Sequence, residues 1–338
     1  MKYISVADAA LIWNVAERTV RNYCATNKIA GAKLIGKTWN IPANSIKPTR
    51  NGKTNTIRNL LSVLQEEQVS KNTGGIYHKV QIDLTYNSNH IEGSKLTHDQ
   101  TRYIFETNTI GIEKDAVNIN DIVETVNHFR CIDIIITDAK RKLSENFIKK
   151  LHSILKTNTS DSRKDWFAVG SYKKFPNEVG GNATTLPEEV PTAINKLLTK
   201  YNAIKHKTLK NIIDFHVSFE AIHPFQDGNG RIGRLIMFKE CLANNIVPFI
   251  ITDDMKMYYY QGLKEWNIEK GFLTDTCLSA QDNFKATLDY FRITYDLEPP
   301  RYNKTTLDSI AEGRRISRDP QVKGYNSIEE LKTALDKD

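Results

Sequence analysis

The sequence predicts a mainly α-helical protein preceded by a small, basic N-terminal domain. Between about residues 57 and 297, apolar residues recur at helical spacing in one segment after another, and a single stretch alternates as strands do. Residues 1–58 hold ten Lys or Arg against two acidic residues, whereas the 338-residue chain as a whole has a net charge of only +7. Charge and periodicity therefore divide the chain into different parts, and its length fits two or three domains.

The composition excludes several classes of protein. No apolar run approaches the roughly 20 residues that a membrane helix needs, and the start, MKYISVADAAL, lacks the apolar core and cleavage site of a signal peptide. We therefore expect a folded, cytoplasmic protein without membrane contact. The cysteines form no CxxC pair and have no zinc-type spacing, which predicts reduced and largely buried thiols at Cys24, Cys131, Cys241 and Cys277.

Residues 1–50 predict a helix, a turn, a second helix and a basic hairpin. Ser5 and Asp8 form a capping-box pattern, AERTVRNYCATNKI predicts the second helix, and AGAKLIGKTWNIP predicts two short strands. This layout resembles the winged helix-turn-helix of the MerR and excisionase type, which implies DNA binding with Lys33 and Lys37 on the wing. Docking to a protein instead is the alternative. The DNA contacts expected on the second helix are Arg18, Thr19, Arg21 and Asn22.

A polar linker, KPTRNGKTNT, leads into the helical domain expected over residues 57–297. Within that domain WFAVGSYKKFPNEVGGNATTLPEE combines strand-like alternation with Gly and Pro, which predicts a single β-hairpin. PPRYNK marks a further boundary before a C-terminal segment at 300–338 with one or two short helices. The helices are predicted at LLSVLQEE, LTHDQTRYIFE, DIVETVNHFRCIDIII, LSENFIKKLHSIL, VPTAINKLLTKYNAI, LKNIIDFHVSFEAI and GRLIMFKECLANN.

The segment HPFQDGNGRIGR concentrates polar chemistry between two predicted helices, one ending near Ile222 and one beginning near Arg231. A glycine-containing loop that enters a helix leaves main-chain N–H groups unpaired beside the positive end of the helix dipole, which favours anions. Two arginines three residues apart share one face of the first turn and can contact adjacent phosphates. The phosphate contacts are expected from Gly228, Asn229, Gly230, Arg231 and Arg234.

Two further side chains in this segment have distinct chemical roles. Asp227 lies beside the expected phosphates and suits Mg²⁺, which binds one or two carboxylates together with phosphate oxygens. His223 is the group here that takes up a proton near neutral pH. A base, a metal-binding carboxylate and a polyphosphate site together point to phosphoryl or nucleotidyl transfer.

The segment resembles the signature of the Fic (Fido) family, HxFx(D/E)GNGRxxR, without departure. The resemblance implies a helical bundle that transfers AMP from ATP to a Ser, Thr or Tyr hydroxyl of a target protein. In that scheme His223 deprotonates the hydroxyl and Asp227 holds Mg²⁺ between the α and β phosphates. Arg231 and Arg234 hold the β and γ phosphates, with Asn229 and the flanking glycine amides as further phosphate contacts. Phe225 belongs to the site as a core anchor that orients the loop.

Three other stretches resemble parts of the same family. The hairpin at 173–187 resembles the Fic flap, which implies that a target protein docks there by β-augmentation. In YYQGLKEWN, Tyr260 and Asn267 are two helical turns apart and match positions that contact adenine. TYNSNHIEGS resembles the inhibitory motif (S/T)xxxE(G/N).

In the inhibitory motif Ser88 and Glu92 are four residues apart on one face of a helix expected near 85–93. Gly93 is placed to end that helix. If this helix packs against the one that Arg231 begins, Glu92 pairs with Arg234 and occupies the site of the γ-phosphate.

Several functions follow from these patterns. The leading hypothesis is a self-inhibited protein adenylyltransferase with a DNA-binding module, with a homo-oligomer left open. The alternatives are removal of AMP from a modified protein, transfer of another nucleotide or phosphate, and a transcription regulator that uses the Fic domain as a nucleotide sensor. Residues 300–338 resemble the tail of RelB or DinJ type antitoxins, which implies a small toxin as partner, and a solvated amphipathic tail is the equal alternative.

Overall fold

The chain forms two compact units, residues 1–58 and residues 59–338, and each is described here by itself. Lys37 and the predicted antitoxin-like tail at 300–338 lie outside the described residues, as does the side chain of Arg18. The computed structural model describes residues 3–13, 15, 17–25, 28–35, 38–48, 59–111 and 116–295.

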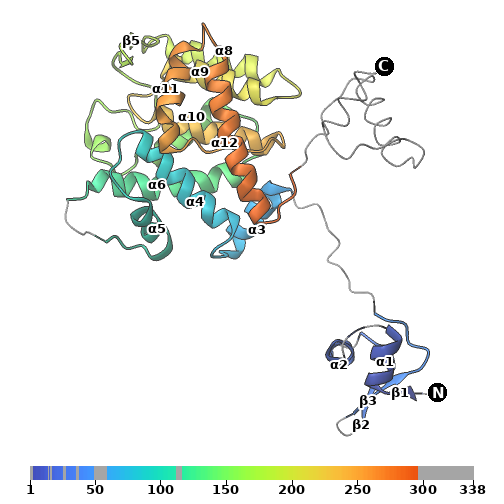
Figure 1. Cartoon of the computed structure of the whole chain (residues 1–338). Helices are drawn as coiled ribbons and strands as arrows, with labels where there is room; N and C mark the ends of the chain where they lie inside the picture. Colours follow the sequence, from blue (N-terminus) through green and yellow to red (C-terminus); the bar gives the residue numbers. More distant parts are fainter. Residues whose placement is uncertain are drawn as a thin grey trace, which may run out of the picture. The chain divides into compact units, whose positions relative to one another are not determined.

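The N-terminal unit has two helices packed on a small sheet (Figure 1). The sheet is antiparallel with the strand order β1-β3-β2. Ser5 and Asp8 exchange the hydrogen bonds of a capping box, as predicted. The elements are β1 (Tyr3–Ile4), α1 (Val6–Trp13), α2 (Glu17–Ala25), β2 (Lys33–Ile35) and β3 (Thr38–Pro42).

The two predicted strands are confirmed, whereas β1 had no counterpart in the sequence prediction. The second helix is shorter than predicted and ends at Ala25. The main-chain N–H of Lys28 turns back to the carbonyl of Tyr23, which closes the helix end. The order of helices and hairpin suits a winged helix-turn-helix, but that assignment stays a prediction.

The second unit is a helical bundle with one short hairpin (Figure 1). All seven helices predicted from periodicity are present. The long α12 was not predicted. The helices are α3 (Leu60–Ser70), α4 (Ile76–Ile91), α5 (His98–Thr107), α6 (Ile119–Thr137), α7 (Glu145–Lys156), α8 (Val190–Asn202), α9 (Leu209–Ile222), α10 (Asn229–Ala243), α11 (Lys256–Glu265) and α12 (Gly271–Tyr290), with 3₁₀ turns η1 (Asp161–Arg163) and η2 (Asp253–Met255). The hairpin pairs β4 (Glu178–Val179) with β5 (Asn182–Ala183).

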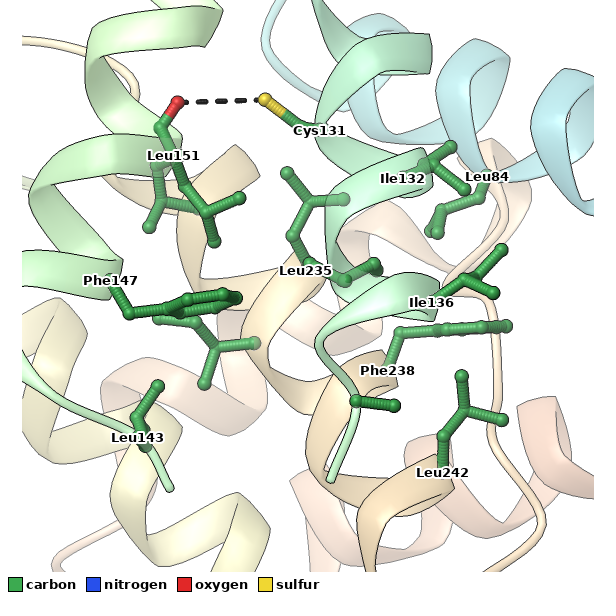
Figure 2. Close-up of a cluster of buried hydrophobic side chains, with 14 of the residues drawn as sticks. Leu84, Cys131, Ile132, Ile136, Leu143, Phe147, Leu151, Leu235, Phe238 and Leu242 are labelled. Atoms are coloured by element: carbon green, nitrogen blue, oxygen red, sulfur yellow. Dashed lines mark hydrogen bonds between the residues drawn. The ribbon is translucent and has the colours of Figure 1, made fainter. Parts of the chain in front are cut away.

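Helix α10 is the centre of this unit and is buried along most of its length. It packs against α9, α6, α4 and α7. Figure 2 shows part of the core that surrounds it, with the Cys131 thiol directed at the Leu151 carbonyl at 3.5 Å. The core residues labelled there come from α4, α6, α7, α10 and the turn before α7, namely Leu84, Cys131, Ile132, Ile136, Leu143, Phe147, Leu151, Leu235, Phe238 and Leu242.

All four cysteines are buried and free, as the sequence predicted. Among the described residues, no helix combines the length and the apolar character needed to cross a bilayer.

Candidate active site

The segment HPFQDGNGRIGR forms a tight corner between α9 and α10. His223 ends α9 in a left-handed conformation (φ 50°), and its N–H donates to the Phe219 carbonyl at 2.9 Å. Gly228, also left-handed (φ 83°), precedes the first residue of α10. The helix therefore begins two residues before the predicted start at Arg231, because the left-handed glycine already turns the chain into the helix. Consequently Arg234 lies on the second turn of α10 rather than the first.

The side chain of Asn229 closes this corner. Its Oδ1 accepts from the Phe225 N–H and its Nδ2 donates to the Phe225 carbonyl, both at 2.9 Å. Because these hydrogen bonds occupy the side-chain amide, the group of Asn229 left to bind a phosphate is its main-chain N–H at the start of α10. The ring of Phe225 is fully buried and stacks on His152, with centroids 3.9 Å apart. It anchors the loop from the core and does not line the site.

His223 lies in a largely buried position, with a side chain that is 17% exposed. Burial lowers the pKa of its imidazole, so the ring is neutral near pH 7 and able to accept a proton. Its Nδ1 is 4.0 Å from Oε2 of Glu220, one turn earlier on α9. A neutral imidazole beside the N-terminal end of a helix has the protonation state that a general base needs.

Asp227 faces two cations. Its Oδ2 accepts from Lys156 Nζ at 2.6 Å and from Arg231 Nη2 at 3.1 Å. Glu124 on α6 contacts both of these cations through its two oxygens, and Asp161 contacts Lys156 at 3.2 Å. Although burial favours the neutral carboxyl, the charges of Arg231 and Lys156 hold the pKa of Asp227 well below its ordinary value. Asp227 is therefore a carboxylate at any physiological pH.

The pocket beside Asp227 suits Mg²⁺ that arrives with a polyphosphate. No cluster of three metal-binding side chains exists among the described residues, so the protein alone offers few ligands. Mg²⁺ needs only one or two carboxylates when phosphate oxygens and water supply the rest. The pocket measures about 190 Å³, below the roughly 300–1,000 Å³ of typical ligand sites. It is lined by Asn89, Glu92, Gly93, Ser94, Asp121, Glu124, Lys156, Asp161, Asp227 and Arg231.

The C-terminal end of α4 places Glu92 over the first turn of α10. Arg234 Nη2 donates to Glu92 Oε1 at 2.6 Å and to the Ser88 carbonyl at 2.9 Å, while Nε donates to Ser88 Oγ at 3.0 Å. The predicted pair is present as a single hydrogen bond from Nη2. Nη1 of Arg234 has no partner among the described residues. The Glu92 carboxylate also lies where a side chain on Gly230 would be. Gly93 ends α4 in a left-handed conformation (φ 102°), as predicted.

Residues 142–241 match the model of the Fic/DOC family. The Fic/DOC segment thus includes His223, Asp227 and both arginines. Over 255 residues the chain is 26% identical to "Protein adenylyltransferase Fic" of Drosophila mojavensis, a match that covers 73% of this chain and 47% of the relative. The chain spans about half the length of the curated relatives it matches.

Solved structures of Fic proteins share the fold. A Fic domain containing signaling protein from Bacteroides thetaiotaomicron is 25% identical with a TM-score of 0.51, covering 68% of this chain and 90% of that one. Fic-1 from C. elegans is 18% identical with a TM-score of 0.53, covering 70% of this chain and 72% of that one. At the latter identity the likeness concerns the fold alone.

The predicted hairpin of the Fic/DOC segment is confirmed, with Glu178 opposite Ala183 across a glycine turn. Its base is hydrogen-bonded to the corner between α9 and α10. The N–H of Lys173 donates to the Pro224 carbonyl at 2.9 Å, and Asn177 Nδ2 donates to the Phe225 carbonyl at 3.1 Å. The strands themselves are exposed. The hairpin is therefore held at its root beside the site and is open at its edge.

The two predicted adenine contacts do not share a helix. Tyr260 lies on α11, is 41% exposed, and donates to the Ile91 carbonyl at 3.2 Å, close to Glu92. Helix α11 ends at Glu265, and after the buried Trp266 Asn267 lies exposed in a turn. The expectation of two turns of one helix was wrong.

Three residues around the site were not predicted. Lys156 and Glu124 come from α7 and α6, far along the chain from Asp227, so no local pattern could have indicated them. Glu220, in contrast, could have been found from the sequence. It lies three residues before His223 at the end of a predicted helix, which places the two side chains on one face.

The predicted DNA contacts lie on α2 of the N-terminal unit. Arg21 and Asn22 are exposed and Thr19 is half-buried. Val20 and Cys24 are buried on the opposite face, as predicted. The helix therefore presents the expected polar face to solvent.

Proposed function

We propose that this chain is a protein adenylyltransferase whose own Glu92 inhibits it. The observation that carries the proposal is the contact of the Glu92 carboxylate with Arg234 over Gly230, at the N-terminal end of α10. That end is where phosphates are bound when a helix N-terminus acts as an anion site. The position of the Glu92 carboxylate there, near a neutral His223, supports a phosphate site that Glu92 occupies in the absence of ATP. The match to the Fic/DOC family and to relatives named as protein adenylyltransferases supports the same conclusion.

In the proposed reaction a hydroxyl oxygen of the target attacks the α-phosphorus of ATP. Nε2 of His223 takes the hydroxyl proton, the bond from the α-phosphorus to the bridging oxygen breaks, and pyrophosphate leaves with that oxygen. The main-chain N–H groups at the start of α10 and the guanidinium of Arg234 stabilise the phosphate charge. Asp227 would hold Mg²⁺, which screens the charge of the phosphates. The exposed edge of the hairpin would align the target segment.

The inhibition follows from competition for Arg234. Its Nε and Nη2 already donate to Ser88 and Glu92. A γ-phosphate at this position has to displace the carboxylate, because two anions side by side in a buried site repel each other. ATP therefore binds productively only when Glu92 moves away.

The deciding experiment uses ATP labelled at the α-phosphate with the purified full-length protein and a cell lysate. We expect labelled protein bands with the Glu92→Gly variant and none when His223→Ala is added. Label transferred from the γ-phosphate instead would show kinase chemistry. Release of AMP from modified protein, without its addition, would show the reverse reaction.

We also propose that the N-terminal unit binds DNA. The exposed polar face of α2 and the excess of basic residues in 1–58 support this proposal. Phosphate contacts release counterions, so affinity should fall steeply with salt. The full-length protein and its Arg21→Ala variant should be compared on DNA from the gene's own promoter at two salt concentrations. If the full-length protein retains no promoter DNA even at low salt, docking to a protein is favoured instead.

A further inference from the structure

A row of polar side chains runs along α9 behind the corner between α9 and α10, with His216 buried and the other two mostly buried. His216, Glu220 and His223 are spaced four and three apart, so they lie on one face of the helix. The reaction proposed above uses only His223. The other two side chains require a separate explanation, since buried polar groups are costly unless they are hydrogen-bonded.

The main-chain carbonyl of Glu220 lies near the His223 ring and favours its protonated form, against the effect of burial. The following side-chain atoms of the row make no hydrogen bond of normal geometry with the described residues. They are His216 Nδ1, Glu220 Oε1 and His223 Nδ1. Glu220 Oε2 is 4.0 Å from His223 Nδ1, about 1 Å longer than a hydrogen bond. On the other side, a Cβ on Gly233 would be 2.6 Å from His216 Nδ1 and 2.8 Å from Glu220 Oε1. The absence of a side chain at Gly233 thus lets α10 approach both groups closely.

The row also reaches the arginine that Glu92 contacts. His216 Nε2 and the Tyr259 hydroxyl are 2.6 Å apart. The Tyr259 ring centroid is 5.8 Å from the guanidinium carbon of Arg234. Polar groups from α9, α10 and α11 therefore lie between the proposed γ-phosphate site and the proposed base.

We propose that Glu220 is a positioning residue for His223, and that it accepts a hydrogen bond from Nδ1–H. With the proton fixed on Nδ1, the lone pair on Nε2 is directed at the target hydroxyl. When Nε2 takes the hydroxyl proton the ring becomes a cation, and Glu220 stabilises that cation from the opposite side. This inference rests on the proposed function.

The charge of Glu220 depends on its surroundings. Burial and the negative charge of Glu92 raise the pKa of the Glu220 carboxyl to about 8, against the opposing effect of Arg234. Glu220 is therefore a neutral acid at pH 7 and becomes a carboxylate above about pH 8. The titratable and charged groups around it are Glu92 at the end of α4, Arg234 on α10, Tyr259 and Tyr260 on α11, and His216 and His223 on its own helix.

Two consequences follow. A carboxylate near an imidazolium stabilises the charged ring by roughly one pKa unit or more, so transfer should accelerate about tenfold as the pH rises through 8. Removing the charge of Glu92 lowers the pKa of Glu220, so the same rise should move to lower pH. Inhibition by Glu92 then acts at the base as well as at Arg234.

The test is a pH titration of the full-length protein labelled with ¹⁵N-histidine, in which His223→Ala identifies the His223 signals among those of the eight histidines. We expect the neutral ring to carry its proton on Nδ1, with an inflection of the His223 signals near pH 8. The inflection should vanish in Glu220→Gln, which mimics the neutral acid, and persist in the control Glu17→Gln. It should shift to lower pH in Glu92→Gln.

Transfer rates measured on the same variants separate the two proposals. Transfer without an inflection in the wild type, or an inflection that persists in Glu220→Gln, would overturn the role of Glu220. An inflection with no transfer by any variant would leave that role intact and overturn the adenylyltransferase function. A tenfold alkaline rise present in wild type and absent in Glu220→Gln supports both, since a merely structural role would not change the pH profile.

Discussion

The contact between Glu92 and Arg234 gives the sharpest prediction of activity. Arg234 donates to Glu92 through one charge-assisted hydrogen bond of 2.6 Å, and the carboxylate side chain is 28% exposed. Such a bond contributes about 1.5–3 kcal/mol. If that free energy must be spent before ATP binds productively, Glu92→Gly should raise transfer by about 10- to 150-fold, at roughly 1.4 kcal/mol per tenfold.

The assay is initial-rate labelling from α-labelled ATP over a range of ATP concentrations. Because Glu92 competes for the phosphate site, the gain should be largest at low ATP. Ser88 keeps its two contacts with Arg234 in the variant, so the guanidinium should stay in place. The double variant Glu92→Gly, Arg234→Ala should lose the gain, and Glu17→Gln should match the wild type. A rate for Glu92→Gly within twofold of wild type at every ATP concentration would refute the reasoning.

Three other changes have expected outcomes. His223→Ala should lower transfer by about 10²- to 10⁴-fold while calorimetry shows ATP binding nearly unchanged, and a loss below tenfold would exclude a general base. Arg21→Ala should weaken retention of promoter DNA and reduce its salt dependence, which a filter-binding assay at two salt concentrations checks. The free energy of unfolding in urea should fall between pH 7 and pH 5, and equal midpoints would contradict this. Burial lowers the pKa of three histidines to about 3, namely His128, His152 and His216. Below about pH 6.5 the unfolded chain therefore binds more protons than the folded chain, and acidification lowers the free energy of unfolding.

The sequence was most informative where chemistry is local. The corner between α9 and α10 was predicted from residue types alone, because Gly228 and the following helix start are determined by neighbouring residues. The pairing of Glu92 with Arg234 was also predicted, from the resemblance of two separate motifs, and the structure confirms the contact. The start of α10 was predicted two residues too late. The left-handed Gly228 begins the helix at Asn229, ahead of the apolar periodicity on which the prediction relied.

Long-range contacts could not be predicted in the same way. Lys156 is 1% exposed and meets Asp227 across the bundle, but on α7 it looks like any surface lysine near a helix end. The amide of Asn229 was expected at a phosphate and instead closes its own loop. Asn267 was placed on a helix that ends two residues earlier, at Glu265. Only the contact of Lys156 with Asp227 depends on packing between distant elements, whereas the role of the Asn229 amide is decided within its own loop.

The stacking of Phe225 on His152 has a consequence for thermal inactivation of the protein. The ring planes are 2° from parallel, and both side chains are buried within the helical core. Many enzymes carry their reactive groups on loops that open at little cost, so they lose activity well before they melt. Here the loop between α9 and α10 is anchored in the core by the ring of Phe225. Inactivation and melting should therefore occur at one temperature, so that a thermal scan of transfer activity overlays the scan of helix content.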